Sequence, residues 1–263
     1  MEKFLLIAGP CLLEGRDLGE RVARTLVEVC GKHKDLRLIF KASVDKANRS
    51  SFRSARGIGI AAALEALDHI KKTFSVEVTS DFHEPAQAES LAEVCDVLQV
   101  PAFLCRQTDM LAAAAATGRA VSVKKGQFLS PWDMANVVGK LRQFGAKEII
   151  QIERGTSFGY GNLVVDMRSF PIMAKNGCRT VFDATHSLQM PGLGGETTAG
   201  DRSWYDTLAH AAIGAGADGL FLETHPNPAK ALCDSATQLP LDSIGERLER
   251  HMQLWRTAKA IGN

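Results

Sequence analysis

The sequence predicts an α/β protein that folds as one (β/α)8 TIM barrel, with all of residues 1–263 in that barrel. Three observations support this prediction. Short β-rich runs recur along the chain, helix-length segments with apolar residues at spacings of three and four lie between them, and several runs are apolar on both faces. Runs of the last kind, such as Leu38-Ile39-Phe40 and Leu220-Phe221-Leu222, are typical of a parallel sheet that helices cover.

The predicted elements alternate from strand to helix along the whole chain. The eight strand-like runs are Phe4–Ala8, Leu36–Lys41, Val76–Asp81, Val97–Val100, Ala120–Lys124, Glu148–Glu153, Thr180–Asp183 and Gly219–Glu223. The helix-length segments include Leu18–Val29, Ile60–Ile70, Met134–Phe144 and Trp204–Ile213. Eight such units in 263 residues favour a closed barrel over a doubly wound sheet.

Composition and charge restrict the partners and the compartment. The chain is 45% hydrophobic and 23% charged, and its formal net charge of +1 gives no broad basic field for nucleic acid. No signal-peptide pattern opens it, and no apolar run reaches the roughly 18 residues that a membrane span needs. The six cysteines have no CxxC spacing, so we expect reduced thiols. We therefore expect a cytoplasmic protein that binds small molecules.

Chemically competent side chains lie at or just after the ends of the predicted strands, where barrel enzymes keep their active sites. They are Cys11, Lys41, Asp81, Gln99, Lys124, Arg154, His186 and Glu223. Each has a simpler interpretation when taken alone: Cys11, just after Gly9-Pro10, could be a packed turn residue, and His186 a loop histidine. All eight occurring by accident at strand ends is much less plausible.

Cationic residues suggest an anionic substrate. The set comprises Lys41, Lys46, Arg49, Lys124 and Arg154, with Arg106 as a candidate sixth member. If these side chains converge at one barrel mouth, the pocket suits a doubly or triply anionic ligand, because arginine forks grip phosphate or carboxylate and lysine acts as a point charge. The sequence has neither a Rossmann fingerprint nor a Walker loop, so we expect no organic cofactor.

A set of metal-ligating residue types follows the first, seventh and eighth predicted strands, which are neighbours when a barrel closes. The candidate ligands are Cys11, His186, Glu223 and Asp234. One thiolate, one imidazole and two carboxylates suit a divalent transition ion (Zn, Fe(II), Mn or Co) better than Mg or Ca. Four unrelated residues remain an alternative, and two other histidines close to an acidic residue fit the pattern equally well, in Phe82-His83-Glu84 and Glu223-Thr224-His225.

Seven segments spread over nearly the whole chain carry a family resemblance. They are residues 7–11 (IAGPC), 41–51 (KASVDKANRSS), 101–109 (PAFLCRQTD), 124–128 (KKGQF), 153–155 (ERG), 183–187 (DATHS) and 223–226 (ETHP). Together they resemble the 3-deoxy-D-manno-octulosonate 8-phosphate synthase family. The resemblance implies a (β/α)8 barrel, a homotetramer, and a cytoplasmic bacterial transferase that condenses phosphoenolpyruvate with arabinose 5-phosphate for lipopolysaccharide biosynthesis.

The resemblance also implies roles for individual positions. Lys46, Lys124 and Arg154 match the cations that hold phosphoenolpyruvate, and they join His186 and Asp234 as candidate catalytic residues. The implied substrate-binding residues are Lys41, Asn48, Arg49, Ser50, Asp81, Gln99, Ala102, Phe103, Arg106, Gln189 and Arg202. Among them, the Asn48-Arg49-Ser50 run matches a clamp on the sugar phosphate, and Arg106 matches a residue that reaches a neighbouring subunit.

The turn after the first strand separates two branches of this family. The metal-dependent branch has cysteine there and the other branch has asparagine, so Cys11 implies the metal-dependent branch, with Cys11, His186, Glu223 and Asp234 as ligands. The chain departs from that branch at Cys233, where its members have serine before the aspartate.

Two alternatives remain. The first is a 3-deoxy-D-arabino-heptulosonate 7-phosphate synthase, which has the same barrel and metal ligands but uses erythrose 4-phosphate. That family reads Lys-Pro-Arg-Thr-Ser after the second strand, where this chain reads Lys46-Ala47-Asn48-Arg49-Ser50, so the octulosonate assignment is preferred. The second is a barrel that binds a phosphosugar without catalysis.

Overall fold

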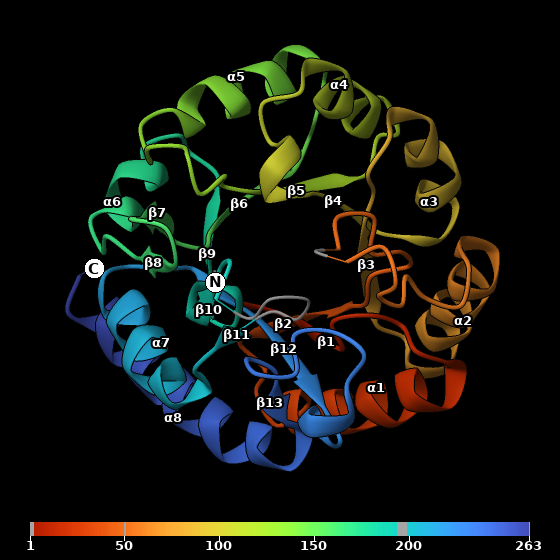
Figure 1. Ribbon diagram of the computed structural model, residues 1–263. Helices are drawn as coiled ribbons and strands as arrows, with labels where there is room; N and C mark the ends of the chain where they lie inside the picture. The colour runs from red at the N-terminus through yellow and green to blue at the C-terminus, as the bar shows by residue number, and fades with distance from the viewer. Residues whose placement is uncertain (1–2, 50, 194–198, 263) are drawn as a thin grey trace.

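In the computed structural model, which describes residues 3–49, 51–193 and 199–262, eight parallel strands close into a barrel inside a ring of helices (Figure 1). The barrel strands are β1 (Phe4–Gly9), β2 (Leu36–Lys41), β3 (Glu77–Asp81), β4 (Val97–Val100), β5 (Ala120–Lys124), β6 (Ile149–Glu153), β9 (Arg179–Asp183) and β12 (Gly219–His225). Each pairs with the next in this order, and β1 also pairs with β12, which closes the barrel. The predicted fold class is confirmed.

The helices lie outside the barrel, and one follows each barrel strand in the sequence. They are α1 (Arg16–Cys30), α2 (Ile60–Phe74), α3 (Ala88–Val94), α4 (Thr108–Ala116), α5 (Met134–Gln143), α6 (Ser169–Ala174), α7 (Tyr205–Gly214) and α8 (Ile244–Ala260). The helix predicted over Ile60–Ile70 continues to Phe74 and ends where Ser75 adopts a left-handed conformation at φ 50°. None of the described helices has the length and hydropathy needed to cross a membrane.

Two apolar layers stabilise the barrel, because strand side chains alternate between its inside and its outside. Leu5 and Ile7 of β1 belong to the cluster that fills the interior, together with Phe221 of β12. Leu6 and Ala8 of the same strand belong to the larger cluster between strands and helices. The strands are therefore buried on both faces, as their continuous apolar runs predict.

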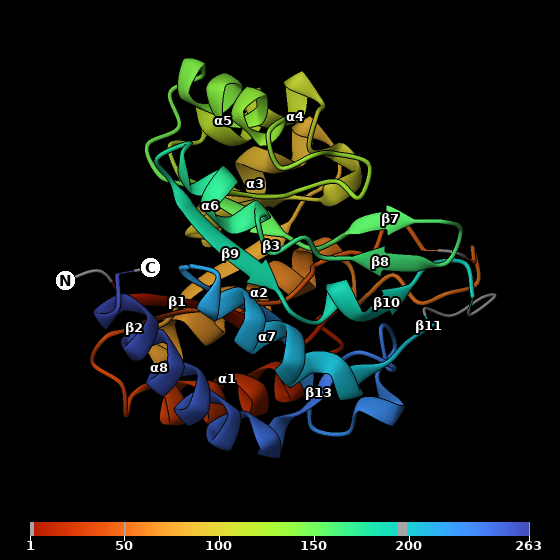
Figure 2. The same cartoon turned by 90° about the vertical axis from the view of Figure 1, so that its left-hand side faces the viewer.

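Shorter elements were not predicted from the sequence. These are the antiparallel hairpin of β7 (Thr156–Phe158) and β8 (Asn162–Val164), the pair β10 (Gln189–Met190) and β11 (Ala199–Gly200), and β13 (Leu239–Pro240), which pairs with β12. Figure 2 shows both antiparallel pairs at the end of the barrel opposite the two chain termini. Single-turn 3-10 helices are Pro85–Gln87, Ala102–Leu104, His186–Leu188, Arg202–Trp204, Pro228–Lys230 and Leu241–Ser243.

Gly9 brings β1 close to β2 where the first strand ends. A Cβ atom at this position would lie 1.9 Å from the backbone oxygen of Lys41, so only glycine permits this approach. Pro10 and Cys11 follow directly, at the carboxyl end of the barrel. The residue order Gly-Pro-Cys thus ends the strand and places a thiol at the barrel mouth.

Candidate active site

A cavity of about 510 Å³ lies at the carboxyl ends of the barrel strands. It brings together the side chains of five predicted catalytic residues and most of the predicted substrate-binding residues, which come from every part of the chain. Those lining it are Lys41, Lys46, Asn48, Arg49, Asp81, Gln99, Ala102, Phe103, Lys124, Arg154, His186, Gln189, Glu223 and Asp234. Their convergence is what the strand-end pattern predicts.

Three of the predicted site residues that the structure describes do not line this cavity. Cys11 is fully buried behind it. Arg106 is exposed, beyond the cavity wall. Arg202 donates hydrogen bonds to the backbone oxygens of the segment after Asp234, at 3.2 Å from Nε to Ala236. Ser50 lies outside the described residues, so the roles of these last three with substrate stay predictions.

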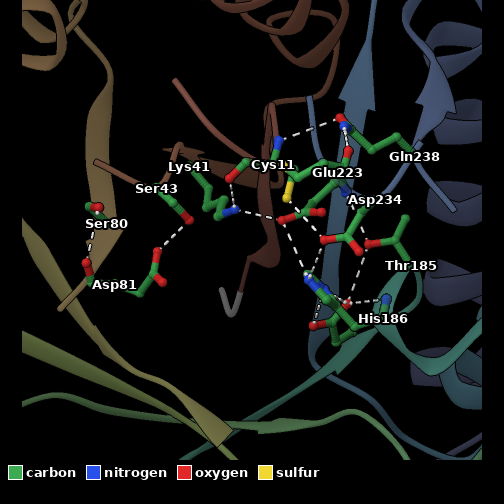
Figure 3. A network of polar contacts seen from close by, with 12 residues as sticks. Cys11, Lys41, Ser43, Ser80, Asp81, Thr185, His186, Glu223, Asp234 and Gln238 are labelled. Carbon is green, nitrogen blue, oxygen red and sulfur yellow. Dashed lines mark hydrogen bonds and ion pairs between the residues drawn. The ribbon is translucent and has the colours of Figure 1, made fainter. Parts of the chain in front are cut away.

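The four candidate metal ligands meet at one side of the cavity (Figure 3). The Cys11 thiol donates to Asp234 Oδ2 at 3.1 Å, and His186 Nε2 lies 3.6 Å from Glu223 Oε1 and 3.9 Å from Asp234 Oδ2. Glu223 Oε2 is buried and has no hydrogen-bond partner among the described residues. A thiol, an imidazole, two carboxylates and an unpartnered buried oxygen fit a divalent transition ion.

Barrel closure explains how these distant residues meet. Gly9 of β1 is in register with Glu223 of β12, so the Cys11 turn lies beside the glutamate. β12 also pairs with β9, after which His186 begins a 3-10 helix. Asp234 follows β12 in a left-handed conformation with φ 46°, which is uncommon outside glycine and is tolerated best by aspartate and asparagine.

Lys41 and Glu223 form a buried ion pair beside the candidate ligands. Lys41 Nζ lies 2.6 Å from Glu223 Oε1 and donates a second hydrogen bond to the Cys11 backbone oxygen at 2.7 Å. Burial opposes ionisation of Glu223, but the nearby charges of His186, Lys41 and Lys46 outweigh it and lower the pKa of that carboxyl. Glu223 is therefore an anion at neutral pH.

Asp183 holds two site residues, although the sequence analysis gave it no role. Its Oδ2 accepts from Lys124 Nζ at 2.6 Å and lies 2.9 Å from His186 Nδ1. Burial opposes its charge, yet His186 and Lys124 lower the pKa of Asp183 far below its usual value. Because the Asp183 carboxylate contacts Nδ1 of the His186 ring, the other ring nitrogen, Nε2, is directed at the candidate ligands. The signal in the sequence was an acidic last residue on an apolar strand.

Three cationic side chains line the cavity, and they differ in their hydrogen bonds and in the direction of their pKa shifts. Arg154 Nη2 donates to the His186 backbone oxygen and to Gln189 Oε1 at 2.6 Å, while its Nη1 is buried without a partner among the described residues. Burial lowers the pKa of Lys124 despite the attraction of Asp183. Burial also opposes the charge of Lys46, but groups led by Cys11 and Glu223 raise its pKa well above the usual value. Unused donors such as Arg154 Nη1 suit an anionic ligand.

Asp81 lies at the opposite side of the cavity from the candidate ligands (Figure 3). It accepts from Ser43 Oγ at 2.5 Å and pairs with His83 Nε2 at 3.1 Å. His83 thus supports Asp81, away from the four candidate ligands. His225, the other alternative histidine, lies 3.8 Å from Glu14 and accepts from the backbone of Asn227.

A (β/α)8 barrel with a cationic cavity next to candidate metal ligands at its carboxyl end is typical of enzymes that act on phosphorylated compounds. Comparison with known proteins narrows this class. A model of the DAHP synthetase I family matches residues 1–260. Similar proteins named 2-dehydro-3-deoxyphosphooctonate aldolase include one from Desulfotalea psychrophila, 51% identical over 249 residues, which are 95% of this chain and 89% of that protein.

Further relatives with the same name come from other bacteria. The protein of Syntrophotalea carbinolica is 49% identical over 95% of this chain and 90% of its own length, and that of Brucella ovis is 50% identical over 97% and 92%. The chain therefore belongs to the DAHP synthetase I family, within its group of 2-dehydro-3-deoxyphosphooctonate aldolases. The family resemblance found in the sequence is confirmed.

Proposed function

We propose that this chain condenses phosphoenolpyruvate with D-arabinose 5-phosphate and water, releasing phosphate and 3-deoxy-D-manno-octulosonate 8-phosphate, the compound in the name of its relatives. The observation that carries the proposal is one cavity of about 510 Å³ that is lined by cations (the cationic wall, made of Lys46, Lys124 and Arg154) and by the imidazole and two carboxylates of the candidate metal site. A site of this kind can bind two anionic substrates. It can also stabilise the positive charge that develops at C2 of phosphoenolpyruvate. The product enters lipopolysaccharide biosynthesis.

The cationic wall is needed to seat the two substrates together, because two phosphate esters at close range repel each other. Lys46, Lys124 and Arg154 bind the phosphate and carboxylate of phosphoenolpyruvate. Asn48 and Arg49, which also line the cavity, bind the sugar phosphate. Arg49 Nη2 donates to the Leu232 backbone oxygen at 2.7 Å, which orients its guanidinium and supports this role.

The reaction forms one carbon–carbon bond and breaks one carbon–oxygen bond. C3 of the enol attacks the sugar aldehyde, positive charge develops at C2, water adds there, and phosphate leaves. Glu223 and Asp234 supply negative charge at the cavity wall, and fixed charges of this kind stabilise the transition state without reorganisation. Lys124 and Arg154 balance the charge of the departing phosphate.

Cys11, His186, Glu223 and Asp234 would hold a divalent transition metal, namely Zn, Fe(II), Mn or Co, and their geometry supports this part of the proposal. When bound, such an ion supplies Lewis acidity toward an oxygen of the substrate. Asp183 fixes the ring of His186 for this purpose through Nδ1. The chain itself supplies the charges, the orientation and the enclosure of the reacting atoms.

The proposal extends to assembly and compartment. We place the enzyme in the cytoplasm as a homotetramer that binds neither nucleic acid nor membrane. Arg106, exposed beyond the cavity of its own chain, reaches the sugar phosphate of a neighbouring subunit in this proposal. Light scattering tests the tetramer, and a loss of activity on dilution to monomers tests the shared site.

Phosphate release from phosphoenolpyruvate with a panel of aldose phosphates, with and without chelator, tests the proposed function. We expect arabinose 5-phosphate to be used at least about tenfold better by kcat/KM than erythrose 4-phosphate, a gap of about 1.4 kcal/mol. Equal use of the two sugars, or a preference for erythrose 4-phosphate, would instead support a heptulosonate synthase. No phosphate release with any aldose would support a binding protein.

A further inference from the structure

A second cysteine lies at the candidate metal centre. One ligand atom each from Cys11, Cys233 and Asp234 lie within 4.8 Å of one another, and the same holds for His186, Glu223 and Asp234. Asp234 therefore joins two groups of possible ligands. Figure 3 shows the Cys11 sulfur directed toward this aspartate. Cys233 is 4% exposed and lines the cavity, whereas Cys11 is fully buried.

The local backbone explains why two consecutive residues both direct ligand atoms to one place. In an extended chain, neighbouring side chains point to opposite sides. Asp234 has φ 46°, and this left-handed conformation breaks that alternation after Cys233. A backbone conformation that is rarely adopted outside glycine often marks a functional site.

One glutamine side chain ties the two cysteines together. Gln238 Nε2 donates to the Cys233 backbone oxygen at 2.9 Å, and Gln238 Oε1 accepts from the Cys11 backbone nitrogen at 3.4 Å. This link joins the turn that follows the first barrel strand to the segment that follows the last one. The two are separated by more than two hundred residues in the sequence. Both bonds are buried, so they hold the backbone segments that carry the two cysteines next to each other.

We propose that Cys233 is a second sulfur ligand, beside Cys11, His186, Glu223 and Asp234, of the metal ion in the proposed function, on which this inference rests. Each thiol loses its proton when it binds the ion, so two protons leave as two sulfur–metal bonds form. Lys41 offsets part of the negative charge of Glu223, and a second thiolate adds negative charge at the ion. Two thiolates select softer ions, Zn²⁺ and Co²⁺, over Mn²⁺.

A packing role is the alternative for Cys233, because Cys11, Leu12 and Cys233 form a small buried apolar cluster. Cobalt spectroscopy separates the two roles, since a thiolate bound to Co²⁺ gives an intense charge-transfer absorption that a packed thiol does not. Serine replaces cysteine with the loss of only the sulfur donor, and circular dichroism checks that each variant folds. Cys178, at the other end of the barrel beside Arg179, provides the matched control.

The full chain is stripped with chelator and titrated with Co²⁺ as parent, Cys11→Ser, Cys233→Ser, the double variant and Cys178→Ser. We expect the charge-transfer absorbance per bound cobalt to fall to about half in each single-site variant and to vanish in the double variant. Cys178→Ser should match the parent. The ratio of Zn²⁺ to Mn²⁺ affinity should fall at least about tenfold in Cys233→Ser.

Two results would overturn the inference, and they can be told apart. If Cys233→Ser keeps the full absorbance while Cys11→Ser loses all of it, the centre has one sulfur ligand and Cys233 only packs. If the parent binds no cobalt, the metal centre itself fails, and the proposed function loses its metal along with this inference.

Discussion

The ammonium of Lys41 lies 2.6 Å from the Glu223 carboxylate, with 2% and 0% of the two side chains exposed. The pair connects β2 to β12 across the carboxyl end of the barrel, and it sits next to the candidate metal ligands. The structure thus provides Glu223 with a cationic partner of its own. The free energy of unfolding should therefore depend on this lysine more than on any exposed one.

Lys41→Met should lower the free energy of unfolding by about 3–5 kcal/mol in the presence of chelator, because it leaves a buried carboxylate without its cation. Denaturant titration measures this. The matched control is Lys72→Met, whose partner Asp68 lies on the same helix and whose side chain is 74% exposed, and it should cost no more than about 0.5 kcal/mol. Similar losses in the two variants would contradict a special role for the Lys41–Glu223 pair.

Arg49→Ala should weaken arabinose 5-phosphate binding at least about tenfold and change phosphoenolpyruvate binding less than about twofold, because a charge-assisted guanidinium–phosphate contact is lost. Lys124→Ala should have the reverse selectivity. Isothermal calorimetry with each substrate and each variant gives the four affinities. Unchanged sugar affinity in Arg49→Ala would remove this arginine from the sugar-phosphate clamp.

Cys11→Ala should lose bound metal and most activity while the barrel stays folded, since Gly9 sets the local backbone. Cys11→Asn should also bind metal weakly, because a neutral amide replaces a soft anionic ligand. We expect the asparagine variant to keep more chelator-resistant activity than the alanine variant, since an amide can hold substrate or water by hydrogen bonds. Metal analysis and assays in excess chelator compare both with the parent.

Full activity of the metal-free parent would contradict the role of Cys11 as a ligand. The thiol would then be a packed turn residue, the simpler interpretation that its position after Gly9-Pro10 also allows.

His251 should make stability depend on pH. It lies on α8 against His210 of α7 and is 1% exposed, and burial, reinforced by His210, lowers its pKa to about 3 from 6.5. The folded chain therefore binds fewer protons here than the unfolded chain at any pH between these values, so stability falls as pH falls below about 6.5. Asp206, Arg247 and Arg250 also contribute to its electrostatic surroundings.

Replacing His251 removes its contribution to the pH dependence of the free energy of unfolding. Between about pH 7 and pH 5, the free energy of unfolding of the parent should fall by about 2 kcal/mol more than that of His251→Phe. Denaturant titration of both proteins at each pH gives the difference. Parallel curves for the two would show that His251 takes up no proton on unfolding in this range.

The sequence by itself determined the barrel and its working end. Runs such as Leu36–Lys41 and Ala120–Lys124 are found as strands with the predicted bounds, because short β-rich runs that alternate with helix-length segments favour a parallel sheet covered by helices. Because Lys41 and Lys124 are the last residues of these two strands, both lie at the mouth of the barrel. Local patterns of this kind depend on neighbours in the chain, so the sequence alone contains them.

Tertiary structure alone decided which distant residues touch. Nothing in the sequence pairs Asp183 with Lys124, joins Cys11 to Cys233 through Gln238, or turns Arg202 onto the backbone after Asp234. The link from Cys11 to Cys233 arises because β1 closes on β12 and brings the first and last turns of the barrel together. Distances across a closed sheet depend on strand register and packing, which no short stretch of sequence specifies.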